Sequence, residues 1–353
     1  MKVLLMKPYS KELYKDMTDL ICDSLEKYHG YTFVKLPVFQ DGKDLKLWKP
    51  FDMELLKDKY DFIWAPYEPL IEVALRIKKM INAPVVGHFE IVPESKFSLE
   101  EIDRKQFEET KIADGRLNDY MAYKLMMDYY LCCDACTYLG QYEKYQMEKL
   151  YGNKIEKKLY DAPYTINNEL FETLIEDVTP KHQIMSVFRL VSTKRAHHVI
   201  EALSLIDNPP KYVILGEGSE KEALEAFAKK LNVDVEFRGI VSDKEKAIVI
   251  QESLFSVHPW ACLPIGETAF FKKPSICYFD SLVYERLGDL AVYVEKNNVR
   301  KLAFKIKELI DDESKRKLLG EKAHDTLINS KSRILLMKET SDTFNEIFKE
   351  GLQ

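Results

Sequence analysis

Unbroken apolar runs of strand length are the feature that most constrains the fold of this chain. Amphipathic segments of helix length separate them. Because the runs do not alternate apolar and polar residues, both faces of each strand are expected to be covered, as in parallel sheets with helical crossovers. The pattern predicts an α/β protein with a doubly wound sheet in each half. The runs are KVLLMKP, TFVKLPV, DFIWAPY, APVVGHFE and DACTYLG, then QIMSVFRLV, KYVILGEG, VDVEFRGIV, LFSVHPW, PSICYF and LAVYVE.

The length of 353 residues is too great for one core and suits two domains of roughly 150–180 residues. Turn signals at Pro163 and Asn167-Asn168 end the first series of strands, and the strand pattern restarts at Ile184. We therefore predict a first domain over 1–168 and a second over 169–333.

The tail from Lys331 to Gln353 is predicted to be helical, with residues 334–353 packing back on the first domain. Its apolar positions are Ile334, Leu335, Met337, Phe344 and Ile347.

Charge and hydropathy narrow the class of protein. The net charge of −6 argues against binding to duplex nucleic acid. No apolar run approaches the roughly 20 residues of a membrane span. The opening MKVLLMKPYS carries a lysine inside its apolar run and is predicted to be a first strand, not a signal peptide. We expect a cytoplasmic protein.

Three smaller features leave alternatives open. The Cys-x-x-Cys formed by Cys133 and Cys136 could be redox-active or bind a metal, but buried reduced thiols are favoured because no second ligand pair exists. The charged segment 91–116 could be a lid or acceptor-site insertion, or a solvated helical excursion. Arg76 and Lys78-Lys79 could attach one helix peripherally to anionic lipid, or form a solvated face.

Polar residues and glycines follow several second-half strands. Arg189 ends one strand and Lys194 follows before a helix; two cations at a carboxyl edge suit a diphosphate, although each alone is an ordinary surface residue. Gly216-Glu217-Gly218 follows the next strand, and it fits either a close approach to a ligand or a plain tight turn.

One carboxylate, Glu267, lies at the expected start of a helix, directly after Pro264-Ile265-Gly266. A carboxylate there can be an ordinary helix-capping charge, and helix starts also bind phosphates.

In this order the pieces resemble the C-terminal domain of family 4 retaining, nucleotide-sugar-dependent glycosyltransferases, which have the GT-B fold. The matching pieces are Phe188-Arg189-Leu190 with Lys194, Gly216-Glu217-Gly218, Phe237-Arg238-Gly239 and Glu267 followed by Pro274. The resemblance implies two Rossmann-like domains that face a central cleft.

The resemblance also implies roles for individual residues. Arg189 and Lys194 would hold the donor diphosphate, near Gly216. Glu267 would accept from the ribose diol, and the backbone around Gly266 to Thr268 would face phosphate and sugar, with Ile265 in the same loop. The backbone near Ile240 would face the base. His88, after APVVG in the first half, would lie near the transferred sugar; such a histidine can equally be a satisfied core residue.

Departures from that family are equally specific. No acid occurs from Phe255 to Gly266, where the family carries a first glutamate that contacts the sugar, so we expect the backbone around Cys262 to Ile265 to replace it. Phe188 stands where a glycine is expected, and Arg195 where a small residue follows Lys194. Pro8-Tyr9-Ser10 replaces a glycine-rich loop.

The leading hypothesis is a glycosyltransferase that moves a sugar from a nucleoside diphosphate sugar, such as a UDP or GDP sugar, to a hydroxyl acceptor. The anomeric configuration would be retained, with neither metal nor cofactor, and the acceptor would be a glycan, a lipid-linked sugar or a protein. The alternative is a catalytically silent nucleotide-sugar-binding protein or complex subunit. Sugar-nucleotide epimerisation ranks last, because no paired acids are placed for it.

Overall fold

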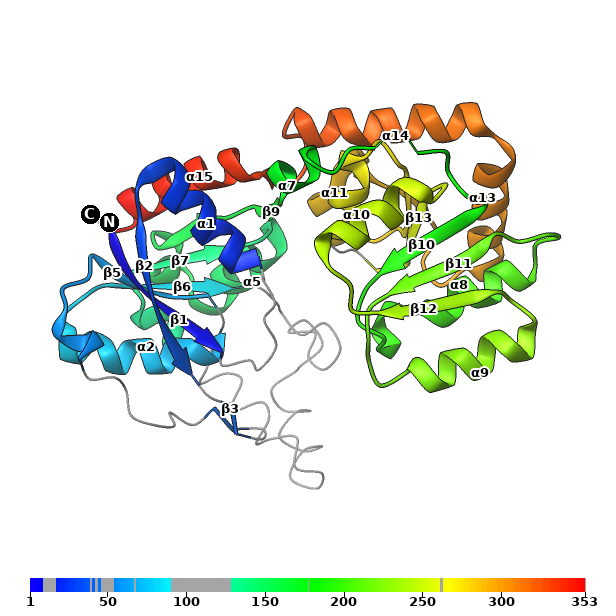
Figure 1. Cartoon of the computed structure of the whole chain (residues 1–353). Helices are drawn as coiled ribbons and strands as arrows, with labels where there is room; N and C mark the ends of the chain where they lie inside the picture. Colours follow the sequence, from blue (N-terminus) through cyan, green and yellow to red (C-terminus); the bar gives the residue numbers. More distant parts are fainter. Residues whose placement is uncertain are drawn as a thin grey trace, which may run out of the picture. The chain divides into compact units, whose positions relative to one another are not determined.

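The computed structural model describes residues 1–8, 17–38, 40–41, 44–45, 54–66, 68–89, 128–176, 178–260 and 263–352. The chain forms two compact units, one of residues 1–163 with 338–353 and one of residues 164–337. Figure 1 colours both units by position in the sequence.

The first unit is built on a parallel sheet with strand order β2-β1-β5-β6-β7-β8. Its strands are β1 (Lys2–Pro8), β2 (Thr32–Val38), β5 (Phe62–Ala65), β6 (Val85–Phe89), β7 (Ala135–Tyr138) and β8 (Leu159–Asp161). Its helices are α1 (Met17–His29), α2 (Glu68–Ile81), α5 (Gln141–Tyr151), α6 (Asn153–Glu156) and α15 (Met337–Glu350). Short elements complete the described part: η1 (Leu55–Lys57), η2 (Tyr129–Cys132), and the pair β3 (Gln40–Asp41) and β4 (Asp44–Leu45).

Both faces of the first sheet are buried, as its unbroken apolar strands predict. Leu4 and Met6 of β1 pack with α2 residues, whereas Val3 and Leu5 pack with residues of α1 and α15. Figure 1 shows α2 on one side of this sheet and α1 with α15 on the other.

The second unit is a parallel sheet with strand order β12-β11-β10-β13-β14-β15, the order of a doubly wound fold. Its strands are β10 (Gln183–Val187), β11 (Lys211–Leu215), β12 (Val235–Gly239), β13 (Ser256–His258), β14 (Ser275–Tyr278) and β15 (Val292–Val294). Its helices are α7 (Asn168–Glu172), α8 (Ala196–Ser204), α9 (Lys221–Leu231), α10 (Asp243–Glu252), α11 (Pro264–Phe270), α12 (Ser281–Leu287), α13 (Val299–Asp311) and α14 (Glu313–Ile328), with single turns η3 (Ser192–Lys194) and η4 (Gly288–Leu290).

A two-stranded parallel pair corrects the predicted tail helix. Residues Ile334–Leu336 form β16, which pairs with β9 (Tyr164–Ile166), and the helix begins only at Met337. The Asn168 side chain accepts a hydrogen bond from the Met337 backbone N–H at 2.9 Å. Because β9 belongs with β16, the units divide between Pro163 and Tyr164, slightly before the predicted boundary at 168.

Within the described residues, none of the helices combines the length and the apolar character needed to cross a membrane.

Candidate functional site

The carboxyl ends of the strands in the second unit lie along one edge of the sheet, where ligands bind in doubly wound folds. Arg189 follows β10, Gly216 follows β11, Ile240 follows β12, and α11 follows β13. The structure thus gathers the residues predicted for the donor along the same edge.

Arg189 and Lys194 lie in the loop between β10 and α8. Arg189 is exposed and Lys194, at the end of η3, is half-buried. The loop is fixed by its backbone: the Leu190 N–H donates to the Glu217 carbonyl at 2.9 Å, and the Glu220 N–H donates to the Leu190 carbonyl at 3.0 Å. Two cations are therefore held on a well-braced loop at the carboxyl edge.

Gly216 and Gly218 are required by packing between loops. Gly216 has φ +134°, and a Cβ there would lie 2.1 Å from the Phe188 carbonyl oxygen. A Cβ on Gly218 would lie 2.3 Å from the Leu190 carbonyl oxygen. The glycines thus bring the loop after β11 against the loop that carries Arg189, which is closer to the tight-turn interpretation than to direct ligand approach.

Glu267 lies on the first turn of α11, which starts with Pro264 in the position that favours proline. Its side chain is buried, with 6% of the residue exposed. The Oε1 atom accepts from Lys246 Nζ at 2.7 Å, and that ammonium also contacts Asp243 at 2.9 Å. The Oε2 atom is buried and has no hydrogen-bond partner among the described residues.

The Lys246 ammonium stays charged beside Glu267. Burial lowers its pKa, but the Glu267 and Asp243 carboxylates outweigh burial and raise it above the ordinary lysine value. The second oxygen, Oε2, is the acceptor of this carboxylate that Lys246 does not engage.

The residues of α11 beside Glu267 are buried, and their polar groups form hydrogen bonds within the helix. Ile265 and Thr268 are buried, and the Thr268 hydroxyl donates to the Pro264 carbonyl at 2.7 Å. The backbone N–H groups of Gly266 and Glu267 both donate to the Leu263 carbonyl, at 2.9 and 3.3 Å. These two N–H groups are therefore engaged within the helix, and their predicted role toward phosphate and sugar stays a prediction.

Ile240 is 53% exposed directly after β12. This exposed isoleucine follows the strand next to β11 and offers an apolar surface at the carboxyl edge. Tyr9, Ser10, Cys262 and the segment 91–116 lie outside the described residues.

His88 lies on β6 in the first unit. Its Nδ1 is 2.6 Å from the Thr137 hydroxyl, and the Tyr130 hydroxyl donates to the His88 carbonyl at 2.7 Å. Its Nε2 is buried without a hydrogen-bond partner among the described residues. Burial lowers the pKa of His88 to about 4, so the imidazole is neutral at pH 7.

Two further residues at the carboxyl edge, His258 and Trp260, were not indicated by the sequence. His258 ends β13 fully buried, and neither ring nitrogen has a hydrogen-bond partner in the described part of the chain. Burial, followed by the nearby Lys194 charge, lowers its pKa to about 3. Trp260 lies two residues further on, with the Arg195 guanidinium carbon 5.6 Å from its ring centroid. The histidine inside the apolar run LFSVHPW could have indicated His258 as a buried polar residue at a strand end.

The Cys-x-x-Cys motif agrees with buried thiols. Cys133 and Cys136 are free and fully buried. The hydrogen bond with Cys133 and burial raise the pKa of Cys136 well above its usual value, so the thiol stays protonated. Across the described ranges, no group of three or more His, Cys, Asp and Glu side chains is arranged to hold a metal ion.

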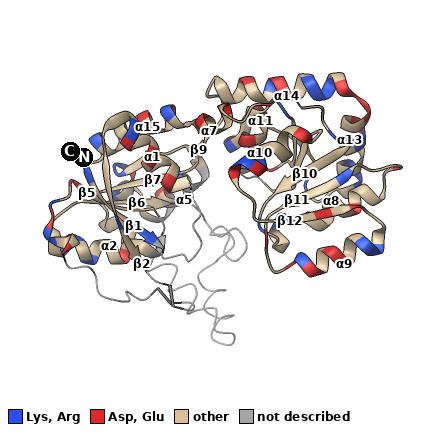
Figure 2. Cartoon of the chain, in the orientation of Figure 1, with Lys and Arg blue, Asp and Glu red and all other residues tan. Residues whose placement is uncertain are grey.

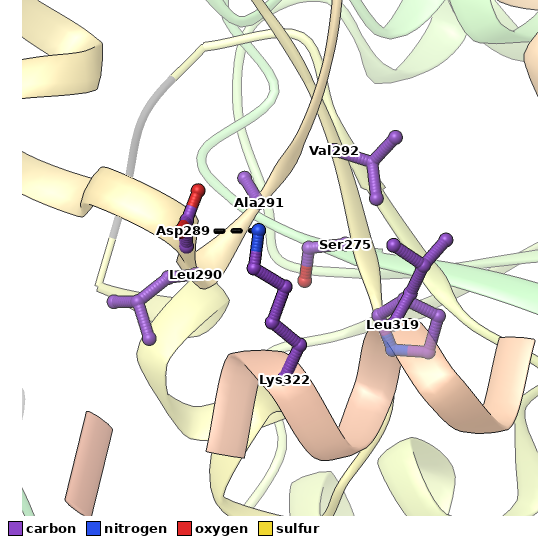
Figure 3. Close-up of a pocket in the computed structure, with 8 residues that line it drawn as sticks. Ser275, Asp289, Leu290, Ala291, Val292, Leu319 and Lys322 are labelled. Carbon is purple, nitrogen blue, oxygen red and sulfur yellow. Dashed lines mark ion pairs between the residues drawn. The ribbon is translucent and has the colours of Figure 1, made fainter. Parts of the chain in front are cut away.

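One cavity lies away from this edge, at the starts of β14 and β15 (Figure 3). Its volume of about 100 Å³ is below the 300–1,000 Å³ typical of ligand pockets. Lys322 of α14 crosses it to pair with Asp289 at 3.1 Å. We assign it no part in the candidate site.

The basic residues of α2 are largely paired. Arg76 pairs with Glu72 on the same helix, and Lys78 pairs with Asp134 at 2.6 Å. Figure 2 shows acidic and basic residues interspersed along α9 and α14 as well. Lys79 is exposed, and attachment of α2 to anionic lipid stays a prediction beside the solvated face.

The second unit, which carries the predicted donor residues, also matches a known protein family. Residues 173–326, all in the second unit, match the model of the family described as Glycosyl transferases group 1. The poly(ribitol-phosphate) alpha-N-acetylglucosaminyltransferase of Staphylococcus aureus (strain COL) is 24% identical over 172 residues, which cover 45% of this chain. The chain matches only 34% of that relative's length.

Solved structures extend the likeness over both units. Anabaena Alr3699/HepE in complex with UDP is similar with a TM-score of 0.72 and 14% identity, covering 99% of this chain and 100% of the other. A mutant of S. aureus TarM, in complex with Fondaparinux, alpha-GlcNAc-glycerol and UDP, has a TM-score of 0.62 and 14% identity, covering 81% of this chain and 55% of the other. The chain therefore has the GT-B fold, and its second unit carries the match to the group 1 glycosyl transferases.

Proposed function

We propose that this protein is a glycosyltransferase that moves a sugar from a nucleoside diphosphate sugar to a hydroxyl acceptor. The Glu267 carboxylate is the observation that carries the proposal. It is buried and charged, with Lys246 on one oxygen and no partner for the other among the described residues. An unpaired buried acceptor costs about 1–3 kcal/mol, and a ribose hydroxyl would recover that cost.

UDP is the nucleotide we propose. The neighbours described above were solved with UDP, and the exposed Ile240 beside the strand ends offers a surface for its base. Arg189 and Lys194 would hold the diphosphate, since a guanidinium fork and an ammonium both suit phosphate oxygens.

Charge that develops on the leaving diphosphate would be stabilised by these fixed cations, without a metal ion. We further propose that the reaction retains the anomeric configuration. His88 is neutral, and its buried Nε2 has no partner among the described residues, so it is proposed to contact the transferred sugar. The acceptor is proposed to be a glycan or a lipid-linked or protein hydroxyl.

The test is a titration of the full chain with UDP, GDP and their sugars, followed by incubation with and without EDTA. We expect a nucleotide to bind in the micromolar to millimolar range and its sugar to be transferred or hydrolysed equally in EDTA. The anomeric proton coupling of the released sugar, measured by NMR before mutarotation, reports retention. Absence of binding at millimolar nucleotide would disprove the proposal. Binding without transfer or hydrolysis for every donor would instead identify the catalytically silent alternative.

A further inference from the structure

Arg195 has a backbone conformation that is energetically unfavourable for an arginine. Its φ of 55° and ψ of 37° are left-handed, and it directly precedes α8. Such a conformation costs a residue with a Cβ roughly 1–2 kcal/mol. Strained residues persist where their surroundings hold them, and they concentrate at ligand sites.

The side chain of Arg195 lies against an aromatic ring, and one of its nitrogens is unsatisfied. Its guanidinium carbon is 5.6 Å from the centroid of the Trp260 ring. Its Nη1 atom is buried and has no hydrogen-bond partner among the described residues. Since an arginine cannot lose its charge, this nitrogen presents an unsatisfied charged donor.

A second cation shares the same ring. Lys296, just after β15, places its Nζ 5.7 Å from the Trp260 centroid. Lys296 also pairs with Asp280 at 2.6 Å, so that carboxylate is already engaged. Arg195, Lys296 and Asp280 by themselves therefore sum to one positive charge.

His198 and Tyr278, which form a hydrogen-bonded pair near Arg195, are both neutral. The His198 Nδ1 is 2.9 Å from the Tyr278 hydroxyl. Burial, His197 and then Arg195 lower the pKa of His198 to about 4, and burial raises the pKa of Tyr278 to about 12. Neither group can neutralise the guanidinium at pH 7.

These residues belong to the carboxyl edge that carries the candidate site. Arg195 directly follows Lys194, Trp260 follows β13, Tyr278 ends β14, and Lys296 follows β15. Because Arg195 directly follows Lys194, a diphosphate held by Lys194 would bring its attached group to this part of the edge.

We propose that Arg195, Trp260 and Lys296 form a subsite for a compact oxyanion, and that this oxyanion is the carboxylate of the transferred sugar. The donor would then be a nucleoside diphosphate hexuronate. A guanidinium fork pairs with a carboxylate through two parallel hydrogen bonds, which would satisfy the buried Nη1. This inference rests on the proposed function and specifies its donor.

The experiment compares the affinities of the full chain for UDP, UDP-glucose and UDP-glucuronate by calorimetry. We expect UDP-glucuronate to bind at least tenfold more tightly than UDP-glucose, which corresponds to about 1.4 kcal/mol. Arg195→Gly should reduce that preference to less than twofold. Because glycine adopts this conformation without strain, the variant should melt no lower than the wild type, so misfolding cannot explain the loss.

Two lysine variants test specificity. Lys296→Gln should lower the preference partially. Lys301→Gln is the matched control, because it removes an exposed lysine paired with Glu295 at 2.6 Å outside the subsite. Its affinities should equal those of the wild type, and a loss of preference there would reduce the effect to net charge.

The outcomes separate the two proposals. If neither UDP nor GDP binds, the proposed function fails. If UDP binds but the two UDP sugars bind equally, the hexuronate assignment is overturned while the function stands. A titration of inorganic phosphate into the UDP complex then tests whether the subsite binds any oxyanion. Arg195-dependent phosphate binding would place the oxyanion on the acceptor, and no binding would overturn the subsite.

Discussion

At the residue scale, Glu267 combines burial, charge and one oxygen without a partner among the described residues in a single side chain. Its partner Lys246 fixes the rotamer by holding Oε1. The carboxylate is therefore pre-organised before any ligand arrives, and ligand binding need not supply the free energy of its ordering.

Substitution of Glu267 should change recognition of the ribose. Glu267→Gln keeps the shape and loses the charge, and it should cost about 1–2 kcal/mol of nucleotide affinity, with more for Glu267→Ala. The wild type should prefer UDP to 2′-deoxy-UDP, and the Ala variant should bind both equally. Four titrations measure the cycle.

Asp243→Asn provides the control, because it removes the other carboxylate on Lys246 and leaves Glu267 in place. It should preserve the ribose preference. If that preference survives in Glu267→Ala, the carboxylate serves Lys246 alone. Should the Ala variant unfold because Lys246 is left buried and without Glu267, the Gln variant still carries the comparison.

The sequence could indicate residues that follow strands in an ordered pattern, such as Arg189, Lys194 and Glu267. It could not indicate which of their atoms are already engaged, as the Gly266 and Glu267 N–H groups are. The sequence did not single out His258 and Trp260, because an apolar run does not reveal where a strand ends. The contact between Trp260 and Arg195 joins loops that are distant in the sequence.

At the element scale, α15 completes the core of the first unit. Phe348 lies 4.6 Å from Phe62 and 5.4 Å from Trp64 between ring centroids. Phe344 lies 5.7 Å from Trp64. The last helix is thus a structural part of a unit whose other residues lie at the opposite end of the sequence.

Truncation of Phe348 should destabilise the first unit. Phe348→Ala removes a ring that is 1% exposed, and buried Phe→Ala changes cost about 3–5 kcal/mol. Phe304→Ala on α13 is the control, because that ring is 69% exposed and its loss should cost little. Chemical denaturation of the full chain, followed by near-UV circular dichroism of both units, measures both effects. Equal effects would show that α15 does not anchor the unit.

The packing of α11 against β16 depends on the absence of a side chain at Gly266. A Cβ there would lie 2.7 Å from Ile334 Cγ2 of β16. Gly266→Ala should therefore destabilise the second unit by about 1–3 kcal/mol, the range for overpacking. Ile334→Ala removes the clashing methyl but costs about 2–5 kcal/mol by itself, because Ile334 is buried. In a double-mutant cycle, measured in a melting experiment, the two changes together should therefore cost less than the sum of the single changes. Additive costs would locate the strain elsewhere.

Sequence patterns predicted the eleven apolar strands well, because strands buried on both faces read as continuous apolar runs. The short strands β8, β9 and β16 were missed. Residues 334–336 continue the apolar stripe of α15, and only their pairing with Tyr164–Ile166, far away in sequence, makes them a strand. Such tertiary pairing overrides local periodicity.

At the scale of the whole molecule, each unit buries a neutral imidazole. The pKa of His88 in the first unit is lowered to about 4 and that of His258 in the second to about 3, chiefly by burial. An unfolded histidine titrates near 6.5. Both units are therefore expected to respond to acid.

Stability should fall as the pH drops below about 6.5, because the unfolded chain then binds protons that the folded chain excludes. The contribution is complete above that pH and is lost progressively toward pH 4 and 3. At pH 5 each imidazole should cost about 2 kcal/mol relative to pH 7.5. Guanidinium unfolding at the two pH values measures the loss. The double variant His88→Gln, His258→Gln should show a flatter dependence, and an unchanged slope would refute the assignment.

The return of α15 to the first unit reverses the order in which the two cores can be completed during synthesis. A chain leaves the ribosome from its N-terminus, and domains generally fold as units in that order. Here residues 1–163 must wait for Phe344 and Phe348, whereas residues 164–337 are continuous and already complete. Ribosome-bound chains arrested with residue 337 outside the exit tunnel should therefore resist protease over the second unit and be cut in the first. Until α15 emerges, Phe62 and Trp64 lack their contacts with Phe344 and Phe348, so we expect a chaperone to bind the first unit during this interval.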